Sequence, residues 1–228
     1  EFPEAALVSE WGKPEVALEA GFDMDFYLHF GDTGYMDLFR GDHPYFGGDP
    51  ESDISVFAGI FAKNQENLRG KGMMCMPSGN HDMARISYQL DEEQMRLAYG
   101  FIYGFPGAPF LYYGDEIGMQ GYRDPFNRAF FDWNSTEQRL RGPLKTLAHL
   151  RKGCDAFDGG RLEIVRADTD VLHYRRIGKT QTAEIILNRG PHLIAELAFG
   201  KYAEVNPGGF TVLVEENHPE HVGYFSIY

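Results

Sequence analysis

The chain has 228 residues, of which 43% are hydrophobic and 14% aromatic, so it is long enough for one large domain or for a domain with a smaller companion. Its formal net charge is −13 and it has no cluster of Lys and Arg, which argues against binding to nucleic acid, because polyanions attract basic surfaces. No run of about 18–20 apolar residues is present, so we predict a soluble globular chain without a membrane span.

The first 158 residues alternate between predicted strands and predicted helices. Short apolar runs that end in Gly or a carboxylate indicate buried strands, and apolar residues at helical spacing after a capping residue indicate helices. The predicted strands span 6–11, 22–31, 72–79 and 108–118. The predicted helices span 14–21, 52–68 with Ser52 or Asp53 as N-cap, 91–105 with Asp91 as N-cap, and 137–157 with a break before Pro143.

The pattern changes after about residue 160. Short alternating segments separated by turns are typical of antiparallel β structure. We therefore predict two domains, a β/α part over residues 1–158 and a small antiparallel β sandwich over residues 159–228. The two cysteines, Cys75 and Cys154, are too few for a disulfide framework. Cys75 lies in an apolar run and is expected in the core, and a bridge between the two stays open.

Polar side chains follow each of the four predicted strands. Four consecutive strand–helix units favour a parallel sheet with right-handed crossovers, and in a (β/α)8 barrel the carboxyl ends of the strands converge on one active-site face. Four units are half of such a barrel. Its open parallel edges would be covered by an N-terminal half or by a second copy. The polar groups are Glu10, His29 to Asp32, Asn80–His81–Asp82, and Asp115–Glu116.

Four stretches resemble a known family. In chain order, "LVSEWG", "AGFDMDF", "SGNHDMAR" and "GAPFLYYGDEIGMQGYRDPFNRAFFDW" look like the second half of the α-amylase superfamily, glycoside hydrolase family 13. The resemblance covers essentially the whole chain and implies strands five to eight of the barrel, followed by the C-terminal β domain. "RDPFNRAFFDW" is similar, less specifically, to the neopullulanase, maltogenic amylase and α-glucosidase branch.

The resemblance also implies roles for single residues. Glu10 matches the general acid/base of the family, which protonates the glycosidic oxygen and then activates water. Asp82 matches the carboxylate that grips hydroxyl groups of the sugar and stabilises the transition state. The residues implied in substrate binding are Asn80, His81, Asp124 and Arg128.

One part of the family's chemistry is missing from this sequence. A retaining glycosidase needs a nucleophilic carboxylate roughly 5–5.5 Å from the acid, and the family places it in a Gly-x-Arg-x-Asp stretch that the chain does not contain. The chain also has no initiator Met, so we expect residue 1 not to be the native start. We therefore expect an upstream segment to supply the nucleophile. The complete protein would then be an α-glycosidase acting on starch-like or malto-oligosaccharide substrates, and this chain alone would be inactive.

No metal or cofactor is expected in this chain, because the calcium site of many relatives would lie in the N-terminal half. Two other interpretations stay open. One is a non-catalytic amylase-like subunit for binding or assembly, which the retention of both Glu10 and Asp82 disfavours. The other is a metal-dependent hydrolase using His29, His81 and Asp82, which the absence of a His-x-His pair disfavours. The compartment and the choice between hydrolysis and transfer stay open.

Overall fold

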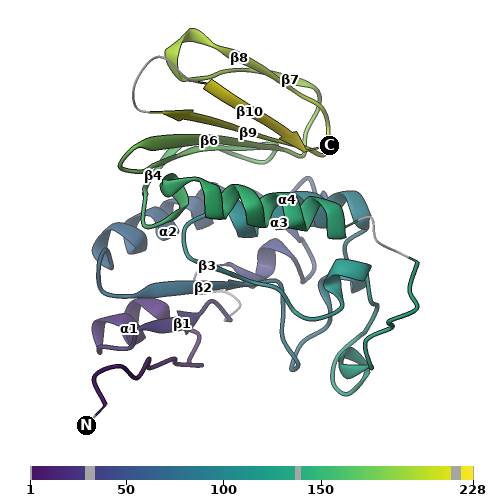
Figure 1. The fold of residues 1–228 in the computed structure, drawn as a ribbon. Helices are drawn as coiled ribbons and strands as arrows, with labels where there is room; N and C mark the ends of the chain where they lie inside the picture. The colour runs from purple at the N-terminus through teal and green to yellow at the C-terminus, as the bar shows by residue number, and fades with distance from the viewer. Residues whose placement is uncertain (1, 29–33, 137–139, 217–221, 228) are drawn as a thin grey trace.

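The computed structural model describes residues 2–28, 34–136, 140–216 and 222–227. Figure 1 shows a parallel sheet, a layer of helices above it and antiparallel strands above the helices. The helices are α1 (Pro14–Glu19), α2 (Ser55–Asn67), α3 (Glu92–Gly104) and α4 (Arg141–Gly153). The strands are β1 (Met24–Phe26), β2 (Met73–Pro77), β3 (Ala108–Phe110), β4 (Arg161–Ala167), β5 (Val171–Ile177), β6 (Gln181–Asn188), β7 (Leu193–Glu196), β8 (Tyr202–Val205), β9 (Gly209–Glu216) and β10 (Val222–Ile227).

The parallel sheet has the strand order β1-β2-β3, so the sequence prediction of parallel pairing is confirmed for three strands. The predicted strand at 6–11 is wrong in extent, because it pairs with β1 only through a bridge between Val8 and Met24. Leu7 and Val8 are 54% and 51% exposed, so within the described ranges no further strand packs on this segment to extend the ladder. The other parallel strands are also shorter than predicted.

The helices follow the sequence pattern with shifted ends. Asp91 caps α3 as predicted, and its side chain and that of Gln94 form a reciprocal capping box. Helix α2 starts at Ser55 rather than after Ser52 or Asp53, and the Asp53 carboxylate accepts the Ser55 N–H at 2.6 Å. The break predicted before Pro143 does not occur. Pro143 lies in the first turn of α4, where the missing N–H is not needed by the helix. Residues 137–139 of that predicted helix lie outside the described residues.

The antiparallel strands form a five-stranded sheet in the order β10-β9-β6-β5-β4 and a two-stranded ribbon of β7 and β8. A small apolar cluster that includes Ile186, Ala195 and Leu213 lies between the sheet and the ribbon. This agrees with the predicted antiparallel character of the C-terminal part. The division into two domains at residue 158 stays a prediction.

Helix α3 packs closely on the five-stranded sheet, and two glycines allow this approach. A Cβ at Gly100 would lie 2.8 Å from a ring carbon of Phe210, and a Cβ at Gly104 would lie 2.4 Å from the hydroxyl of Tyr174. The ring of Phe105 meets that of Tyr174 edge-on at 5.1 Å. One apolar core therefore continues from the helices into the antiparallel sheet.

Arg189, which directly follows β6, forms a second link between the antiparallel sheet and the β/α part of the chain. Its guanidinium donates to the carbonyl oxygens of Tyr45, Asp49 and Ser52 and to the Ser52 hydroxyl. It also stacks over the Tyr45 ring at 4.3 Å. Since five N–H donors are available on one planar group, a single side chain can hold this whole turn.

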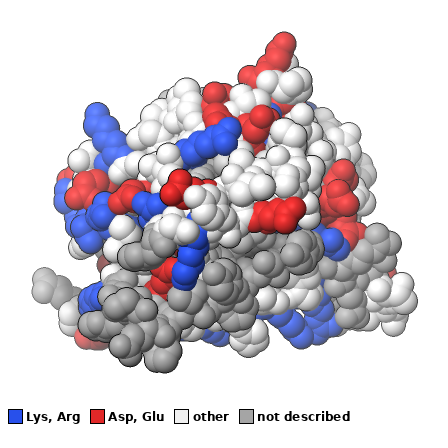
Figure 2. All heavy atoms as spheres, turned by 90° about the horizontal axis from the view of Figure 1, so that it is seen from above, with Lys and Arg blue, Asp and Glu red and all other residues white. Residues whose placement is uncertain are grey.

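Cys75 and Cys154 are free and buried, as expected for core thiols. Within the described part of the chain, no helix is long and apolar enough to cross a bilayer. On the face seen in Figure 2, acidic and basic side chains are interspersed rather than gathered in one basic patch.

Candidate active site

Three of the predicted site residues line one cavity of about 330 Å³ at the carboxyl ends of the parallel strands. Glu10, Asn80 and His81 contribute polar groups to it, and Phe26 and Phe110 form an apolar wall with their rings edge-on at 5.2 Å. The remaining lining residues are Val8, Ser9, Leu28, Pro77 and Gly79. A few polar groups on an apolar wall are typical of a small-molecule site.

Glu10 is exposed to solvent, and the residues that follow it are held by a side chain that the sequence analysis missed. The carboxylate of Asp25 on β1 is fully buried and accepts N–H groups from Trp11 at 3.1 Å, Gly12 at 3.4 Å and Lys13 at 2.9 Å. Gly12 has φ of 81°, a left-handed conformation that favours glycine. Asp25 therefore fixes the turn at which Glu10 leaves the sheet.

The loop that carries Asn80, His81 and Asp82 is anchored by Asn127, which is also fully buried. Its side-chain amide donates to the carbonyl oxygens of His81 at 2.8 Å, Met83 at 2.7 Å and Asn80 at 3.4 Å. Within the loop, the Asn80 side-chain oxygen accepts the Asp82 N–H at 2.9 Å. Asn127 stands in the stretch "RDPFNRAFFDW", but a sequence alone does not indicate which loop its amide contacts.

Asp82, Arg128 and Asp124 form an exposed ion-pair chain beside this loop. Arg128 lies 3.2 Å from the Asp82 carboxylate and 2.7 Å from that of Asp124, and it donates to the His81 carbonyl at 3.0 Å. The side chain of Asp82 is 62% exposed. The structure thus brings Asp124 and Arg128 beside the Asn80–Asp82 loop. Neither they nor Asp82 line the cavity, which is lined by Glu10, Asn80 and His81 among the predicted site residues.

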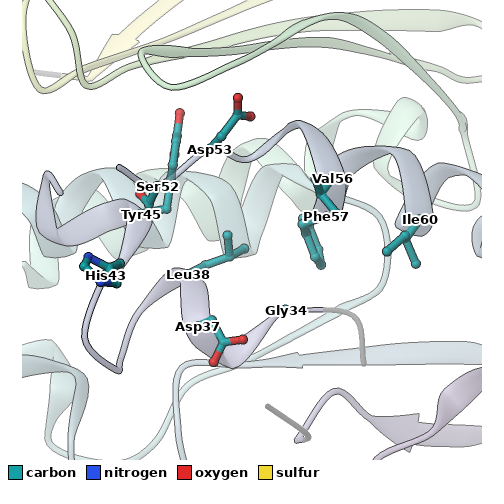
Figure 3. A pocket seen from close by; sticks show the side chains of 10 residues that line it. All are labelled: Gly34, Asp37, Leu38, His43, Tyr45, Ser52, Asp53, Val56, Phe57 and Ile60. Atoms are coloured by element: carbon teal, nitrogen blue, oxygen red, sulfur yellow. The ribbon is translucent and has the colours of Figure 1, made fainter. Parts of the chain in front are cut away.

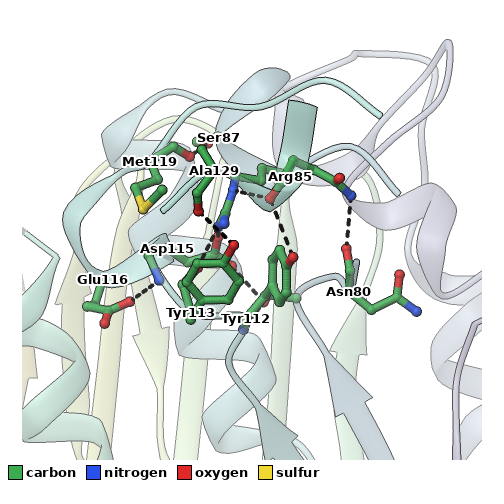
Figure 4. Close-up of polar contacts among 12 residues, drawn as sticks. Asn80, Arg85, Ser87, Tyr112, Tyr113, Asp115, Glu116, Met119 and Ala129 are labelled. Carbon is green, nitrogen blue, oxygen red and sulfur yellow. Dashed lines mark hydrogen bonds and ion pairs between the residues drawn. The ribbon is translucent and has the colours of Figure 1, made fainter. Parts of the chain in front are cut away.

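A buried polar network lies beneath the loop (Figure 4). Asp115 forms an ion pair with Arg85 at 3.2 Å and accepts hydrogen bonds from Tyr99 at 2.6 Å and Ser78 at 2.8 Å. Burial raises the pKa of Asp115, and these hydrogen bonds and the Arg85 charge oppose that rise. Arg85 also donates to the carbonyl oxygens of Tyr113 and Asn127.

Through this network Asp115 and Glu116 hold the loop after β3. Asp115 is 1% exposed and has three side-chain partners. Glu116 accepts the Gly114 N–H at 2.7 Å. Since both carboxylates are engaged by the protein, they stabilise the strand end rather than face the cavity.

His29 and Asp32 lie outside the described residues. Among the described residues, one group of three side chains could hold a metal ion. It consists of His43, Asp49 and Glu51, whose ligand atoms lie within 4.8 Å of one another, and it does not include His81 or Asp82. His43 also borders a separate cavity of about 270 Å³ beside α2, which none of the predicted site residues lines (Figure 3).

Parts of the chain are similar to known proteins. A family model described as "Alpha amylase, catalytic domain" matches residues 49–157. An amylopullulanase from Thermoanaerobacterium thermosulfurigenes is 35% identical over 95 residues, which are 42% of this chain and 5% of that protein. A cyclomaltodextrinase from Geobacillus thermopakistaniensis (strain MAS1) is 36% identical over 117 residues, which are 49% of this chain and 20% of that protein.

A solved structure extends the similarity over most of the chain. The ligand-free cyclic α-maltosyl-(1→6)-maltose hydrolase from Arthrobacter globiformis superposes with a TM-score of 0.75 at 25% identity, covering 92% of this chain and 49% of that one. The chain therefore spans less than half the length of each of these three relatives.

Proposed function

The chain belongs to the α-amylase family of glycoside hydrolases, and on that premise we propose that it forms strands five to eight of the catalytic barrel of a retaining α-glycosidase, followed by the C-terminal β domain. The three parallel strands and the bridge at Val8 would be these four strands. The complete protein would cleave or transfer α-glucosidic bonds in malto-oligosaccharides. The names of the relatives, which refer to cyclomaltodextrin, pullulan and a cyclic maltosyl-maltose, support this substrate class.

The observation that carries this proposal is the cavity shared by Glu10, Asn80 and His81. In the proposed mechanism Glu10 protonates the glycosidic oxygen and then takes a proton from the attacking water or acceptor sugar. Asp82 and His81 bind hydroxyl groups of the sugar most strongly when its ring carries positive charge, so they raise the rate more than the affinity. Asn80, Asp124 and Arg128 position these groups and the substrate.

A segment upstream of Glu1 would supply the nucleophile, since the chain contains no Gly-x-Arg-x-Asp stretch. The open side of the parallel sheet supports this proposal. Val8 is 51% exposed, and Phe110, in the wall of the cavity, is 44% exposed. The preceding half of the barrel would cover these side chains. A second copy of the chain is the other candidate for this position.

The decisive variant is Glu10→Gln in the complete protein. It should lower kcat on maltotriose at least 1,000-fold, because the leaving sugar then departs without a proton. With a nitrophenyl maltoside, whose leaving group needs little protonation, kcat/KM should fall much less, while kcat stays low because the second step still lacks its general base. Glu4→Gln, another exposed glutamate near the N-terminus, serves as the control and should keep kcat within twofold. Near-normal activity of Glu10→Gln would exclude Glu10 as the acid/base.

We proposed that the open side of the parallel sheet, with exposed Val8 and Phe110, is covered by the preceding half of the barrel or by a second copy. Light scattering on the isolated 228-residue chain tests this separately. We expect self-association, because exposed strand edges and apolar side chains pair with other copies. A stable lone monomer at micromolar concentration would contradict the pairing proposal, and it would leave the test of Glu10 unaffected.

A further inference from the structure

A cavity of about 500 Å³ lies at the other end of the parallel strands, next to Met73 at the start of β2 and Ala108 at the start of β3. Its lining differs in charge from the rest of this acidic chain. Of the residues that line it, all within the described part, Asp158 is the one carboxylate. The cationic lining residues are Arg69, Arg151, Lys152 and Arg176.

Two of these arginines bind the same turn of backbone. Arg151 on α4 donates to the carbonyl oxygens of Tyr103, Phe105 and Gly107. Arg176 on β5 donates to those of Gly104 at 3.1 Å and Gly160 at 3.4 Å. All of these carbonyl groups except that of Gly160 lie at or just beyond the end of α3, where they are natural acceptors because a helix leaves its last carbonyls unpaired.

The two guanidinium groups have more donors than the protein has acceptors for them. Together they carry ten N–H groups, and the carbonyl contacts above number five. Arg176 is 1% exposed, and its Nε has no hydrogen-bond partner among the described residues. A buried donor left without an acceptor is unfavourable, so this group favours an additional acceptor from outside the chain.

Like charges meet at this place, where Asp158, the one carboxylate of the lining, offsets only part of the positive charge. Both guanidinium carbons lie about 6 Å from the centre of the Phe157 ring, at 6.0 Å for Arg151 and 5.7 Å for Arg176, and neither arginine forms an ion pair within the described part of the chain. Burial and, to a smaller extent, the charge of Arg151 together lower the pKa of Arg176 to about 10. An anion in the cavity would relieve this repulsion.

We propose that the 500 Å³ cavity binds a small phosphate-type oxyanion, held by Arg176 and Arg151 with Lys152 at its rim. The phosphate oxygens would accept from the unpaired Nε–H of Arg176 and from the surplus N–H groups of Arg151, in the forked geometry that guanidinium groups offer to phosphate. Free phosphate and the phosphate group of a sugar ester present the same chemistry. The volume falls within the range of ligand pockets that hold whole small molecules.

The test is calorimetric titration of the complete protein with inorganic phosphate and with glucose 6-phosphate, at constant ionic strength. We expect saturable binding of phosphate that Arg151→Gln weakens at least tenfold. Lys152→Gln, at an exposed position, should weaken it about threefold and provides the readout if Arg151→Gln does not fold. Arg161→Gln on β4, an exposed arginine outside the cavity, is the matched control for the loss of one charge.

The outcomes separate the sources of the anion. Tighter binding of glucose 6-phosphate than of inorganic phosphate would identify a sugar phosphate as the occupant, and equal or weaker binding would identify free phosphate. The proposal is wrong if neither compound binds saturably, or if Arg161→Gln weakens binding as much as Arg151→Gln does. Because no substrate turnover is measured, this result is independent of the proposed glycosidase activity.

Discussion

The two faces of the parallel sheet differ in how they are covered. On one face, α2 and α3 bring an array of aromatic rings in tilted contact, including Phe57, Phe61, Phe101 and Phe105, into a core that continues to the antiparallel sheet. On the other face, Phe110 and Val8 remain 44% and 51% exposed beside Glu10. The covered face is therefore held by apolar packing, while the open face displays the candidate site and depends on buried polar groups such as Asp25 for its shape.

The largest effect is expected from removing the polar anchor of Glu10. Asp25→Ala leaves three backbone N–H groups without their acceptor and should lower the free energy of unfolding by about 3 kcal/mol. In the complete protein it should also reduce turnover more than 100-fold, since Glu10 loses its position. Urea unfolding and kcat on maltotriose check this. Asp25→Asn, which keeps one acceptor oxygen, should recover about half of the lost stability, and equal losses in both variants would contradict the anchoring role.

On the covered face, a single methyl group should be enough to disturb the packing. Gly100→Ala places a Cβ 2.8 Å from the Phe210 ring and should lower the free energy of unfolding by about 2 kcal/mol, because a close-packed core has no room for it. The matched control is Gly59→Ala in α2, where a Cβ meets nothing within 4 Å. That variant should gain about 0.5–1 kcal/mol from its better helix propensity. Similar changes for both variants would show that α3 is not tightly packed on the sheet.

The stability of the covered side should also depend on pH through Asp155. Burial raises the pKa of this carboxyl, but hydrogen bonds from the Thr180 N–H and hydroxyl and from the Gln181 N–H outweigh it, so the pKa is lowered overall. A lowered pKa stabilises the fold fully above the unfolded value of about 3.9, and this stabilisation is lost as the pH falls through the folded value. Asp155→Asn should therefore cost about 1 kcal/mol at pH 7, and this cost should shrink as the pH falls below the unfolded value of about 3.9. A difference that persists at low pH would contradict this interpretation.

The smallest effect on stability is expected from the exposed ion pairs of the open face. Arg128→Gln removes contacts to Asp82 and Asp124 at side chains that are 44–62% exposed. Such pairs contribute about 0.2–1 kcal/mol, so the free energy of unfolding should change by no more than about 0.5 kcal/mol. Thermal unfolding checks this. A loss above about 2 kcal/mol would mean that the open face stabilises the fold as strongly as the covered one.

The sequence predicts the covered face better than the open one. Helices α2 to α4 and the strands β4 to β6 follow periodic apolar patterns, and Asp91 has the residue type and spacing of a capping box. The strand predicted at 6–11 was too long because an apolar pattern does not reveal whether a neighbouring strand exists to pair with it. Elements of strong local pattern were therefore predictable, and elements that need a distant partner were not.

The candidate site was predictable in part. Glu10, Asn80 and His81 were found because they follow parallel strands and match a family motif, and the structure brings them to one cavity. Asp25 and Asn127 were missed because their importance lies in the backbone groups they hold, 12–14 and 44–47 residues away along the chain. Long-range contacts of this kind leave no local pattern, although an Asp inside an otherwise apolar strand is a signal that could have pointed to Asp25.

The contacts of Asn127 have a consequence for how this chain can change over time. One amide bonds to the carbonyl groups of three residues in the Asn80–Met83 loop. A substitution in the loop after β2 therefore changes the effect of a substitution in the loop after β3, and the reverse also holds. A change that is neutral in one loop alters the background in which the other is selected, so their effects are coupled rather than additive. New specificities at this edge of the sheet would then arise by paired replacements across the two loops, with Asn127 the last residue to vary.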